Sequence, residues 1–347
     1  MMRLPLSWLL AFTTAALALL LLGSLATGPM TLTLGESLRA LFAGQESGIE
    51  SHKLLIVQEI RLPRTLLCIA VGGILGLCGA VMQGLFRNPL ADPGIIGVSG
   101  GAALGAALAI VLLAPLAPQY GQQLQATIGV GLLPLLAFLG GALTTTLVYL
   151  LGTREGGTSV TVMLLAGVAI TALSGAVIGL LTYLADDQML RNLSLWQMGT
   201  LAAGKPADVA LALLTLAALL WFFMRDANPL NALLLGEGEA RHLGVNVQSL
   251  KRRLILLTAA GVGVAVAVSG MIGFVGLVVP HLVRLLAGPN HVRLLPLSAL
   301  LGAALLLAAD MLARTLLAPA ELPVGIITAL LGAPFFIWLL VKGRRAL

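Results

Sequence analysis

The chain has 347 residues, of which 59% are hydrophobic and only 10% are charged, and its formal net charge is +6. A water-soluble domain of this length could not cover its surface with so few charged side chains, so the composition excludes that class. Nearly all the charge lies in short connections between long apolar stretches, which is the pattern of a polytopic membrane protein.

Ten apolar stretches are long enough to be membrane crossings, because an apolar helix needs about 20 residues to span the hydrocarbon core. Helices are expected at that depth, where every backbone amide must be hydrogen-bonded internally. The alternating segments of about ten residues that are typical of a β-barrel do not occur. In chain order, the predicted crossings are about 7–28, 61–85, 95–114, 127–151, 159–185, 207–224, 253–268, 271–287, 294–313 and 323–341.

Three of these crossings are less certain in kind or in extent than the others. The first apolar run is longer than the h-region of a secretory signal peptide, so we expect a retained helix. The seventh and eighth crossings are separated only by Ser269 and Gly270, so their boundary is the weakest of the ten.

Positive charge predicts how the crossings are oriented. Ten crossings place both termini on one side. With the termini inside, 13 of the 20 Lys and Arg residues lie on the inner side and 7 on the outer side. The positive-inside rule therefore predicts cytoplasmic termini. No basic patch with interleaved aromatic residues occurs, so we expect no nucleic-acid partner.

Three connections are long enough to carry function: 29–60 and 186–206 outside, and 225–252 inside, where charge is densest. No soluble domain is attached, so we predict a single transmembrane domain over residues 1–347, with a candidate contact segment at about 228–250. Within it, Glu237 to Gly244 has the pattern of a short amphipathic helix bounded by glycines. Its acidic residues come first and its basic residues later, which suits the helix dipole. A solvated loop is the alternative.

Glycines recur at four-residue spacing in two places. Gly72 and Gly76 lie in the second crossing, and Gly97, Gly101 and Gly105 in the third. Such spacing lets helix backbones approach closely in lipid, so we predict a packing role.

No set of residues for catalysis or metal binding emerges. The four histidines lack metalloprotease spacing, and none of the four lysines is followed by Ser or Thr, as a phosphate-binding loop requires. Cys68 and Cys78 lie about 15 Å apart along one helix, too far to pair. An intramembrane enzyme would need a catalytic dyad at membrane depth, and the sequence shows none. We therefore predict that the chain is not an enzyme and binds no cofactor or metal.

Asp310 is the clearest ionisable residue within a predicted crossing, and Arg314 follows it at i,i+4. We interpret the two as an ion pair at a helix end. An ion-coupled secondary transporter is the alternative class, and it would need Asp310 as its relay. Since the chain has no nucleotide site, uphill transport would otherwise draw its energy from a partner at the inner connection.

Several segments resemble the permease subunits of ABC importers for iron-siderophores, haem and vitamin B12, the FecCD type. Two positions depart from the family pattern: Gly100 stands where a second Ser is usual, and Asn290 where Asp is common. Together the motifs are highly specific, and the resemblance covers about residues 55–342. The matching segments are Arg61–Arg64, Gln83–Gly94, Gly97–Ala102, Leu195–Thr200, Gly273–His291, Leu312–Thr315, Glu321–Thr328 and Gly332–Trp338.

The resemblance implies the type II ABC importer permease fold, with ten helices per subunit and a translocation path between two copies in a homodimer. It also implies two ABC ATPase subunits on the cytoplasmic face, which hydrolyse the ATP, and a periplasmic substrate-binding protein on the outer face. The expected location is the bacterial inner membrane. The implied cargo is an iron chelate, with haem favoured slightly over a ferric siderophore and cobalamin as the alternative.

The resemblance also implies site residues at both faces. Arg61, Arg64 and Arg314 match arginines that receive acidic side chains of the binding protein, and we expect them to be exposed at the outer rim, where charge steers docking. Membrane-interface snorkelling is the alternative. The residues that match the ATPase-coupling segment are Gly236, Glu237, Glu239, Ala240, Arg241, His242 and Gly244.

Candidates for the translocation path rest on chemistry alone. Met163, Tyr183, Trp196 and Met198 could contact a large apolar cargo, although packing is the alternative for each. We place no histidine at mid-membrane, so a fixed ligand for haem iron along the path is not expected.

Overall fold

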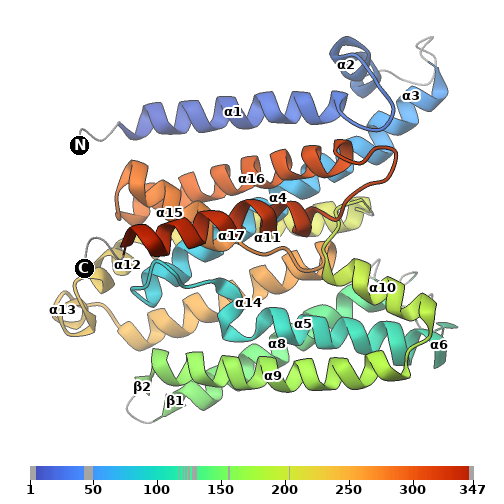
Figure 1. The fold of residues 1–347 in the computed structure, drawn as a ribbon. Coiled ribbons are helices and arrows are strands. Elements are labelled where there is room, and N and C mark those ends of the chain that lie inside the picture. The colour runs from blue at the N-terminus through green and yellow to red at the C-terminus, as the bar shows by residue number, and fades with distance from the viewer. Residues whose placement is uncertain are drawn as a thin grey trace.

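The structure is a computed structural model that describes residues 5–42, 50–116, 131–154, 157–202 and 204–343, with a few positions between 118 and 126. Long helices lie side by side and form a bundle (Figure 1). Among the described residues, eight helical segments are long and apolar enough to cross a membrane, and two further apolar helices are shorter. Each helix satisfies its own backbone, which leaves the apolar side chains free to face lipid or one another.

The long segments include two composite ones. The first combines α3 (Ser51–Leu55), η1 (Ile56–Arg61) and α4 (Leu62–Leu85), and the second combines α5 (Val98–Ala107), η3 (Leu108–Leu113) and α6 (Ala114–Leu116). The others are α1 (Leu6–Ala26), α8 (Leu132–Gly152), α9 (Val160–Leu184), α11 (Pro206–Arg225), α14 (Val247–Ser269) and α16 (His291–Thr315). The shorter apolar helices are α15 (Val275–Ala287) and the apolar part of α17 (Val324–Gly343).

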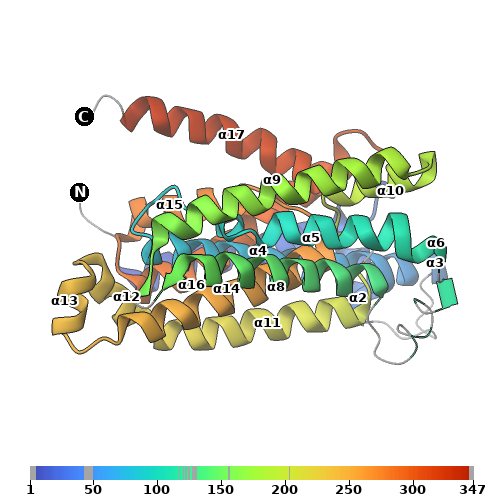
Figure 2. The same cartoon turned by 90° about the horizontal axis from the view of Figure 1, so that it is seen from below.

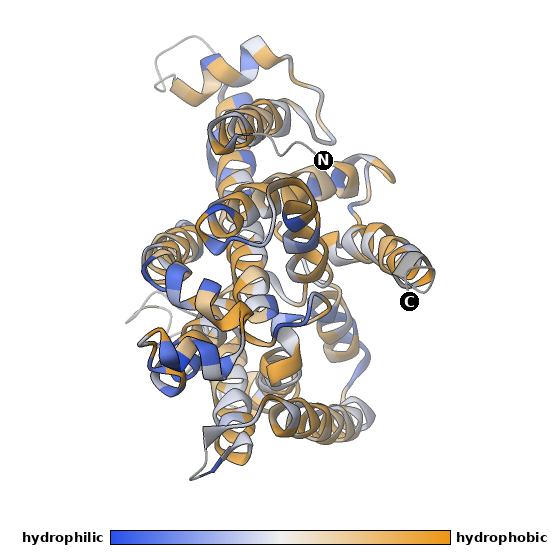
Figure 3. Ribbon diagram, turned by 90° about the vertical axis from the view of Figure 1, so that its left-hand side faces the viewer, coloured by the Kyte–Doolittle hydropathy of each residue, from blue (hydrophilic) through white to orange (hydrophobic). Residues whose placement is uncertain are grey.

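Short elements gather at the two ends of the bundle (Figure 1). One end, called the α10 end here, carries α2 (Leu34–Phe42) and α10 (Asp187–Gln197). The other, the α13 end, carries α12 (Ala227–Leu234), α13 (Glu237–His242) and an antiparallel pair of strands, β1 (Thr153–Arg154) and β2 (Gly157–Thr158). A 3₁₀ turn, η2 (Pro93–Ile96), precedes α5. Viewed from the α13 end, hydrophilic residues gather in these short elements and hydrophobic residues along the long helices (Figure 3).

The ten predicted crossings correspond to these ten apolar helices, so the predicted all-α membrane fold is confirmed. Among the described residues, α1 begins and α17 finishes on the same side of the bundle, at the α13 end (Figure 1). An even number of crossings requires this arrangement. The first four residues of the predicted crossing 127–151 lie outside the described residues, as do the counted cations Arg3, Arg344 and Arg345.

Several predicted boundaries differ from the structure. The helical segment of the second crossing begins at Ser51 and not near 61. The eighth helix begins at Val275 and not near 271, because Gly270 and Phe274 both adopt positive φ, at 68° each, and interrupt the helix. The seventh begins at Val247 and not near 253, because its first turns are helical but carry charge. Apolar length alone could not detect a helix that extends beyond its apolar part.

Close backbone contacts hold α4 at the centre of the bundle. A Cβ atom at Gly72 would lie 2.4 Å from the carbonyl oxygen of Gly302 on α16, and one at Gly79 would lie 1.9 Å from that of Gly276 on α15. A Cβ at Gly105 would lie 2.0 Å from the backbone of α8. The predicted packing role of the spaced glycines is therefore confirmed, although Gly97 instead starts α5 with a φ of 85°.

Burial differs sharply between the helices. The apolar window of the segment that contains α4 is 89% buried, whereas those of α1 and α9 are each 17% buried. α17 diverges from the bundle toward its C-terminal end (Figure 2). α4 is thus the central element of the bundle, whereas α1 and α9 leave most of their surfaces uncovered.

Candidate functional sites

A buried group of charges, the arginine cluster (Arg64, Asp310, Arg314 and Glu321), lies at the α10 end. Arg64 on α4 approaches Asp310 on α16 with its Nη2 2.9 Å from Oδ1, and Arg314 Nε lies 3.0 Å from Oδ2. The Asp310 side chain is 0% exposed, so two guanidinium groups neutralise one carboxylate that water does not reach. The predicted ion pair of Asp310 with Arg314 is confirmed, and Arg64 joins it from another helix.

Glu321 is the one member of the arginine cluster that solvent reaches substantially. It lies between α16 and α17, and its Oε2 accepts a hydrogen bond of 2.6 Å from Arg64 Nη1. Its side chain is 33% exposed, against 6% for Arg64. Arg64 is therefore shared between one buried and one accessible carboxylate.

Arginines also cap the C-terminal end of α1. Arg61 Nη1 donates to the carbonyl oxygens of Leu25 and Ala26 at 2.7 and 2.9 Å, and Arg314 Nη1 donates to that of Thr27 at 3.1 Å. The last carbonyl groups of a helix have no partner within it and carry partial negative charge, which explains their attraction for guanidinium groups.

The expectation that these three arginines are exposed is wrong. Arg61, Arg64 and Arg314 are 3%, 5% and 2% exposed. Asp310 and the end of α1 draw their guanidinium groups inward, and neither attraction is visible without knowing which helices are neighbours. All three do lie together near the α10 end, and their docking role stays a prediction.

The connection 29–60, which was predicted to be outside, is held by an ion pair near the same end. Glu36 on α2 accepts hydrogen bonds from Lys53 Nζ at 2.9 Å and from Thr33. The contact with Lys53, followed by those with Thr33, lowers the pKa of Glu36 to about 2. This carboxylate therefore stays charged, and α2 stays linked to α3, throughout the physiological pH range.

At the opposite end, α13 begins at Glu237 as predicted and ends at His242, two residues before the predicted end at Gly244. Gly236 and Gly244 flank it with φ values of 121° and 84°, a backbone region that residues with a Cβ rarely adopt. Ala240 is buried, whereas Glu239 is exposed and Glu237 half-buried. Arg241 and His242 are exposed in the last turn. The helix therefore presents mixed charge to whatever lies beyond this end of the bundle, and the coupling role of these residues stays a prediction.

A second polar group at this end, the hairpin clamp (Lys251, Glu237, Thr158 and Gln248), was missed by sequence reasoning. Lys251 Nζ lies 2.6 Å from Glu237 Oε1 and donates to the carbonyl oxygen of Thr158 at 2.9 Å. Gln248 Oε1 accepts from the Thr158 amide at 3.0 Å. Lys251 had been counted only as a charge of the inner connection, because the predicted helix began two residues after it.

Further polar contacts fix the segment that leads to α13. Arg253 on α14 pairs with Asp226, with Nε 2.7 Å from Oδ2. On α12, Asn231 accepts a hydrogen bond of 2.8 Å from the amide of His291, the first residue of α16. The chain on the α12 side of α13 is thus attached to both α14 and α16.

The four path candidates do not come together. The Met163 side chain is buried against Gly152, between α8 and α9, whereas Tyr183 is 87% exposed at the other end of α9. Trp196 and Met198 lie at the end of α10, where the Met198 carbonyl faces Gly325. The path role stays a prediction for each of them.

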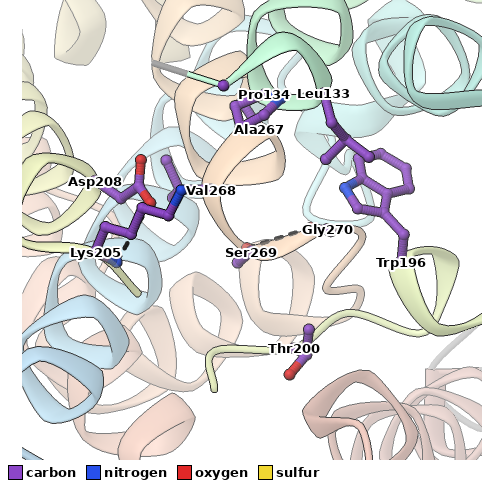
Figure 4. A pocket seen from close by; sticks show the side chains of 11 residues that line it. Leu133, Pro134, Trp196, Thr200, Lys205, Asp208, Ala267, Val268, Ser269 and Gly270 are labelled. Atoms are coloured by element: carbon purple, nitrogen blue, oxygen red, sulfur yellow. Dashed lines mark hydrogen bonds between the residues drawn. The ribbon is translucent and has the colours of Figure 1, made fainter. Parts of the chain in front are cut away.

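Trp196 borders a cavity of about 210 Å³ at the α10 end. Figure 4 shows its indole facing Leu133 and Pro134 across the cavity from Lys205 and Asp208. The lining combines an aromatic surface with one cation and one carboxylate. Within the part of the chain that the structure describes, no three His, Cys, Asp or Glu side chains gather as a metal site would require.

Comparisons with known proteins identify similar membrane transport proteins. A sequence model of the FecCD transport family matches residues 16–342. The hemin transport system permease protein HmuU of Yersinia pestis is 46% identical over 340 residues, which cover 97% of this chain and 96% of that protein. The vitamin B12 import system permease protein BtuC of Vibrio cholerae is 42% identical over 289 residues, 83% of each chain.

Two solved structures are also similar to this chain. A structure described as an inward-facing conformation of a metal-chelate type ABC transporter superposes with a TM-score of 0.81 at 34% identity, covering 97% of this chain and 100% of that one. The PsaBC structure from Streptococcus pneumoniae, at 19% identity and a TM-score of 0.57 over 82% of this chain and 91% of that one, shares the fold alone.

Proposed function

Because this chain belongs to the FecCD transport family and is a permease of an ABC importer for a metal chelate, haem or vitamin B12, we propose that its cargo is haem. ATP is hydrolysed by a separate chain, and this subunit is not an enzyme. The observation that supports haem is the similarity to the hemin permease, 46% identical over 97% of this chain, against 40% to 43% for the cobalamin and vitamin B12 permeases.

The uncovered face of α9 supports a homodimer. A Cβ atom at Gly175 or Gly179 would meet nothing within 4 Å, whereas glycines at the same spacing on α4 already touch another backbone. Paired small residues lower the distance at which two helices can pack, and lipid chains gain nothing comparable from them. This face is assigned to a second copy of the chain, and the path would run between the two copies, with Tyr183 at its α10 end.

Two ABC ATPase subunits are assigned to the α13 end. This places the chain in the bacterial inner membrane with both termini cytoplasmic, which agrees with the excess of Lys and Arg on that side. The exposed residues Glu239, Arg241 and His242 would contact a groove of the ATPase, between the positive-φ glycines Gly236 and Gly244. Closure of the ATPases on ATP would push α13 and change which side of the dimer is open.

The periplasmic binding protein is assigned to the α10 end. Because Arg61 and Arg314 are engaged with the end of α1, docking through this region centres on Arg64. An acidic side chain of the binding protein would replace Glu321, the accessible carboxylate, while Asp310 keeps its contacts. The arginines then fix the register of docking more than its strength.

An ion-coupled mechanism finds little support in the geometry. Asp310, its candidate relay, is 0% exposed and lies between Arg64 and Arg314. A proton or sodium relay needs access to water, and this carboxylate is enclosed by its two guanidinium partners.

The experiment is ATP hydrolysis and uptake by the reconstituted complex of permease, ATPase and binding protein. In separate arms, the binding protein is loaded with haem, a ferric siderophore or cobalamin. We expect the haem-loaded protein to stimulate hydrolysis most and to deliver cargo into the vesicles. Stronger stimulation by cobalamin or by the siderophore would overturn the haem assignment, and accumulation driven by a proton or sodium gradient without ATPase would overturn the partner assignment.

A further inference from the structure

Lys251 lies where three segments of the chain meet at the α13 end. It belongs to the second turn of α14, and its side chain is only 3% exposed. Its ammonium group reaches Glu237 in the first turn of α13 at 2.6 Å, and the carbonyl oxygen of Thr158 in strand β2 at 2.9 Å. One side chain therefore connects α13 to the strand pair that precedes α9.

Gln248, three residues earlier on α14, holds the same strand. Its Oε1 accepts from the Thr158 amide at 3.0 Å. A Cβ atom at Gly157 would lie 2.3 Å from Gln248 Nε2, so the strand presses directly against this side chain. Gln248 thus attaches β2 to α14, and Lys251 adds the link to α13.

The charge and the burial of Lys251 make its contacts with Glu237 and Thr158 costly to break. An ammonium group removed from water needs its counter-charge, since an unpaired buried ion is strongly unfavourable. If α13 moved without β2, Lys251 would lose either the carboxylate of Glu237 or the carbonyl of Thr158 while still buried. The two segments are therefore expected to move together.

From β2 the connection to α9 is short. Thr158 is followed by Ser159, which caps α9 through its Oγ, and α9 begins at Val160. The most apolar part of α9 is only 17% buried within the chain, so little packing opposes a displacement of this helix. A movement that reaches β2 would therefore reach α9, the helix whose uncovered face is proposed to contact the second copy.

We propose that Lys251 is a positioning residue that transmits the displacement of α13 to α9. The proposal rests on the proposed function, because it takes the ATPase as the source of that displacement. Lys251 itself contacts neither cargo nor nucleotide, and it acts by keeping Glu237 and Thr158 together.

The test compares Lys251→Met with Arg252→Met in the complete reconstituted complex. Both variants remove one cation, but Arg252 is exposed on the adjacent position of the same helix. We expect Lys251→Met to bind the ATPase and hydrolyse ATP, while haem taken up per ATP falls about threefold to thirtyfold. Arg252→Met should match the wild type, and Lys251→Arg, which can still donate to both partners, should recover most of the loss.

A distance measurement separates transmission from loss of folding. Spin labels are placed at the exposed positions Gly238→Cys on α13 and Arg154→Cys on β1, and the native Cys68 and Cys78 are 0% exposed. In the otherwise wild-type chain, we expect the distance between the labels to stay the same when nucleotide is trapped in the ATPases. In Lys251→Met it should change on trapping.

Each result has one meaning. An unchanged label distance and normal uptake per ATP in Lys251→Met would overturn the proposal, as would a change of distance in the parent chain. If the wild-type complex fails to couple uptake to ATP, the proposed function fails, and that failure is seen before any variant is made.

Discussion

The arginine cluster and the hairpin clamp both bury a cation against a carboxylate, but at opposite ends of the bundle and in different settings. Asp310 is 0% exposed and is held between two long helices, whereas Glu237 is 36% exposed and belongs to a helix of 6 residues. The first group cannot rearrange without exposing or unpairing a charge inside the bundle. The second lies at its edge, where one partner can be re-solvated, so the first suits a fixed frame and the second a moving part.

Among the substitutions considered, Asp310→Asn should lower the stability of the chain most. The substitution leaves the guanidinium groups of Arg64 and Arg314 without their shared buried counter-charge, so we expect a loss of about 3–5 kcal/mol in unfolding free energy. Thermal unfolding of the detergent-solubilised protein checks it. Asp187→Asn, at an exposed position on α10, is the control and should have almost no effect. Equal stability of the two variants would show that the cluster does not hold the frame.

Lys251→Met should destabilise the chain less than Asp310→Asn does. The carboxylate that it leaves behind, Glu237, can turn to water, so we expect a loss of about 1–2 kcal/mol. The same unfolding assay measures it. A loss as large as that of Asp310→Asn would place the clamp in the fixed frame and remove the distinction drawn between the two ends.

Glu321→Gln tests the accessible edge of the arginine cluster. Arg64 keeps its contacts with Asp310, so the stability loss should be at most about 1 kcal/mol. Without a competing carboxylate, Arg64 should bind an acidic side chain of the binding protein more readily. We expect docking affinity, measured by surface plasmon resonance on nanodiscs, to rise about threefold to tenfold. Weaker docking would mean that Glu321 itself contacts the partner.

Arg241→Ala should have the smallest effect on stability, within about 0.5 kcal/mol, because the side chain is exposed on α13. Its effect should appear instead in the affinity for the ATPase, lowered about threefold to tenfold, as for loss of about 1 kcal/mol. Co-purification at graded ATPase concentrations measures this. Arg252→Ala serves as the matched control, and equal affinities of the two variants would contradict a contact through α13.

Much of the fold follows from local properties of the sequence. Apolar length predicted each of the ten apolar helices found among the described residues, eight of which are long enough to cross a membrane. A helix in lipid must satisfy its own backbone regardless of its neighbours. The position of α13 between Gly236 and Gly244 was also local, because glycine adopts their backbone conformations at no steric cost. The pair Asp310 and Arg314 was equally local, one helical turn apart.

The contacts that distinguish the two ends were decided only by the tertiary structure. Arg64 and Asp310 are 246 residues apart, and Lys251 and Thr158 are 93 apart, so no pattern along the chain relates them. Whether a charge is buried depends on which helices become neighbours, and this is set by the close packing of glycines across α4, α15 and α16. The sequence therefore determined the helices and their family, while packing decided that the arginines at the α10 end are buried and that Lys251 joins α13 to the start of α9.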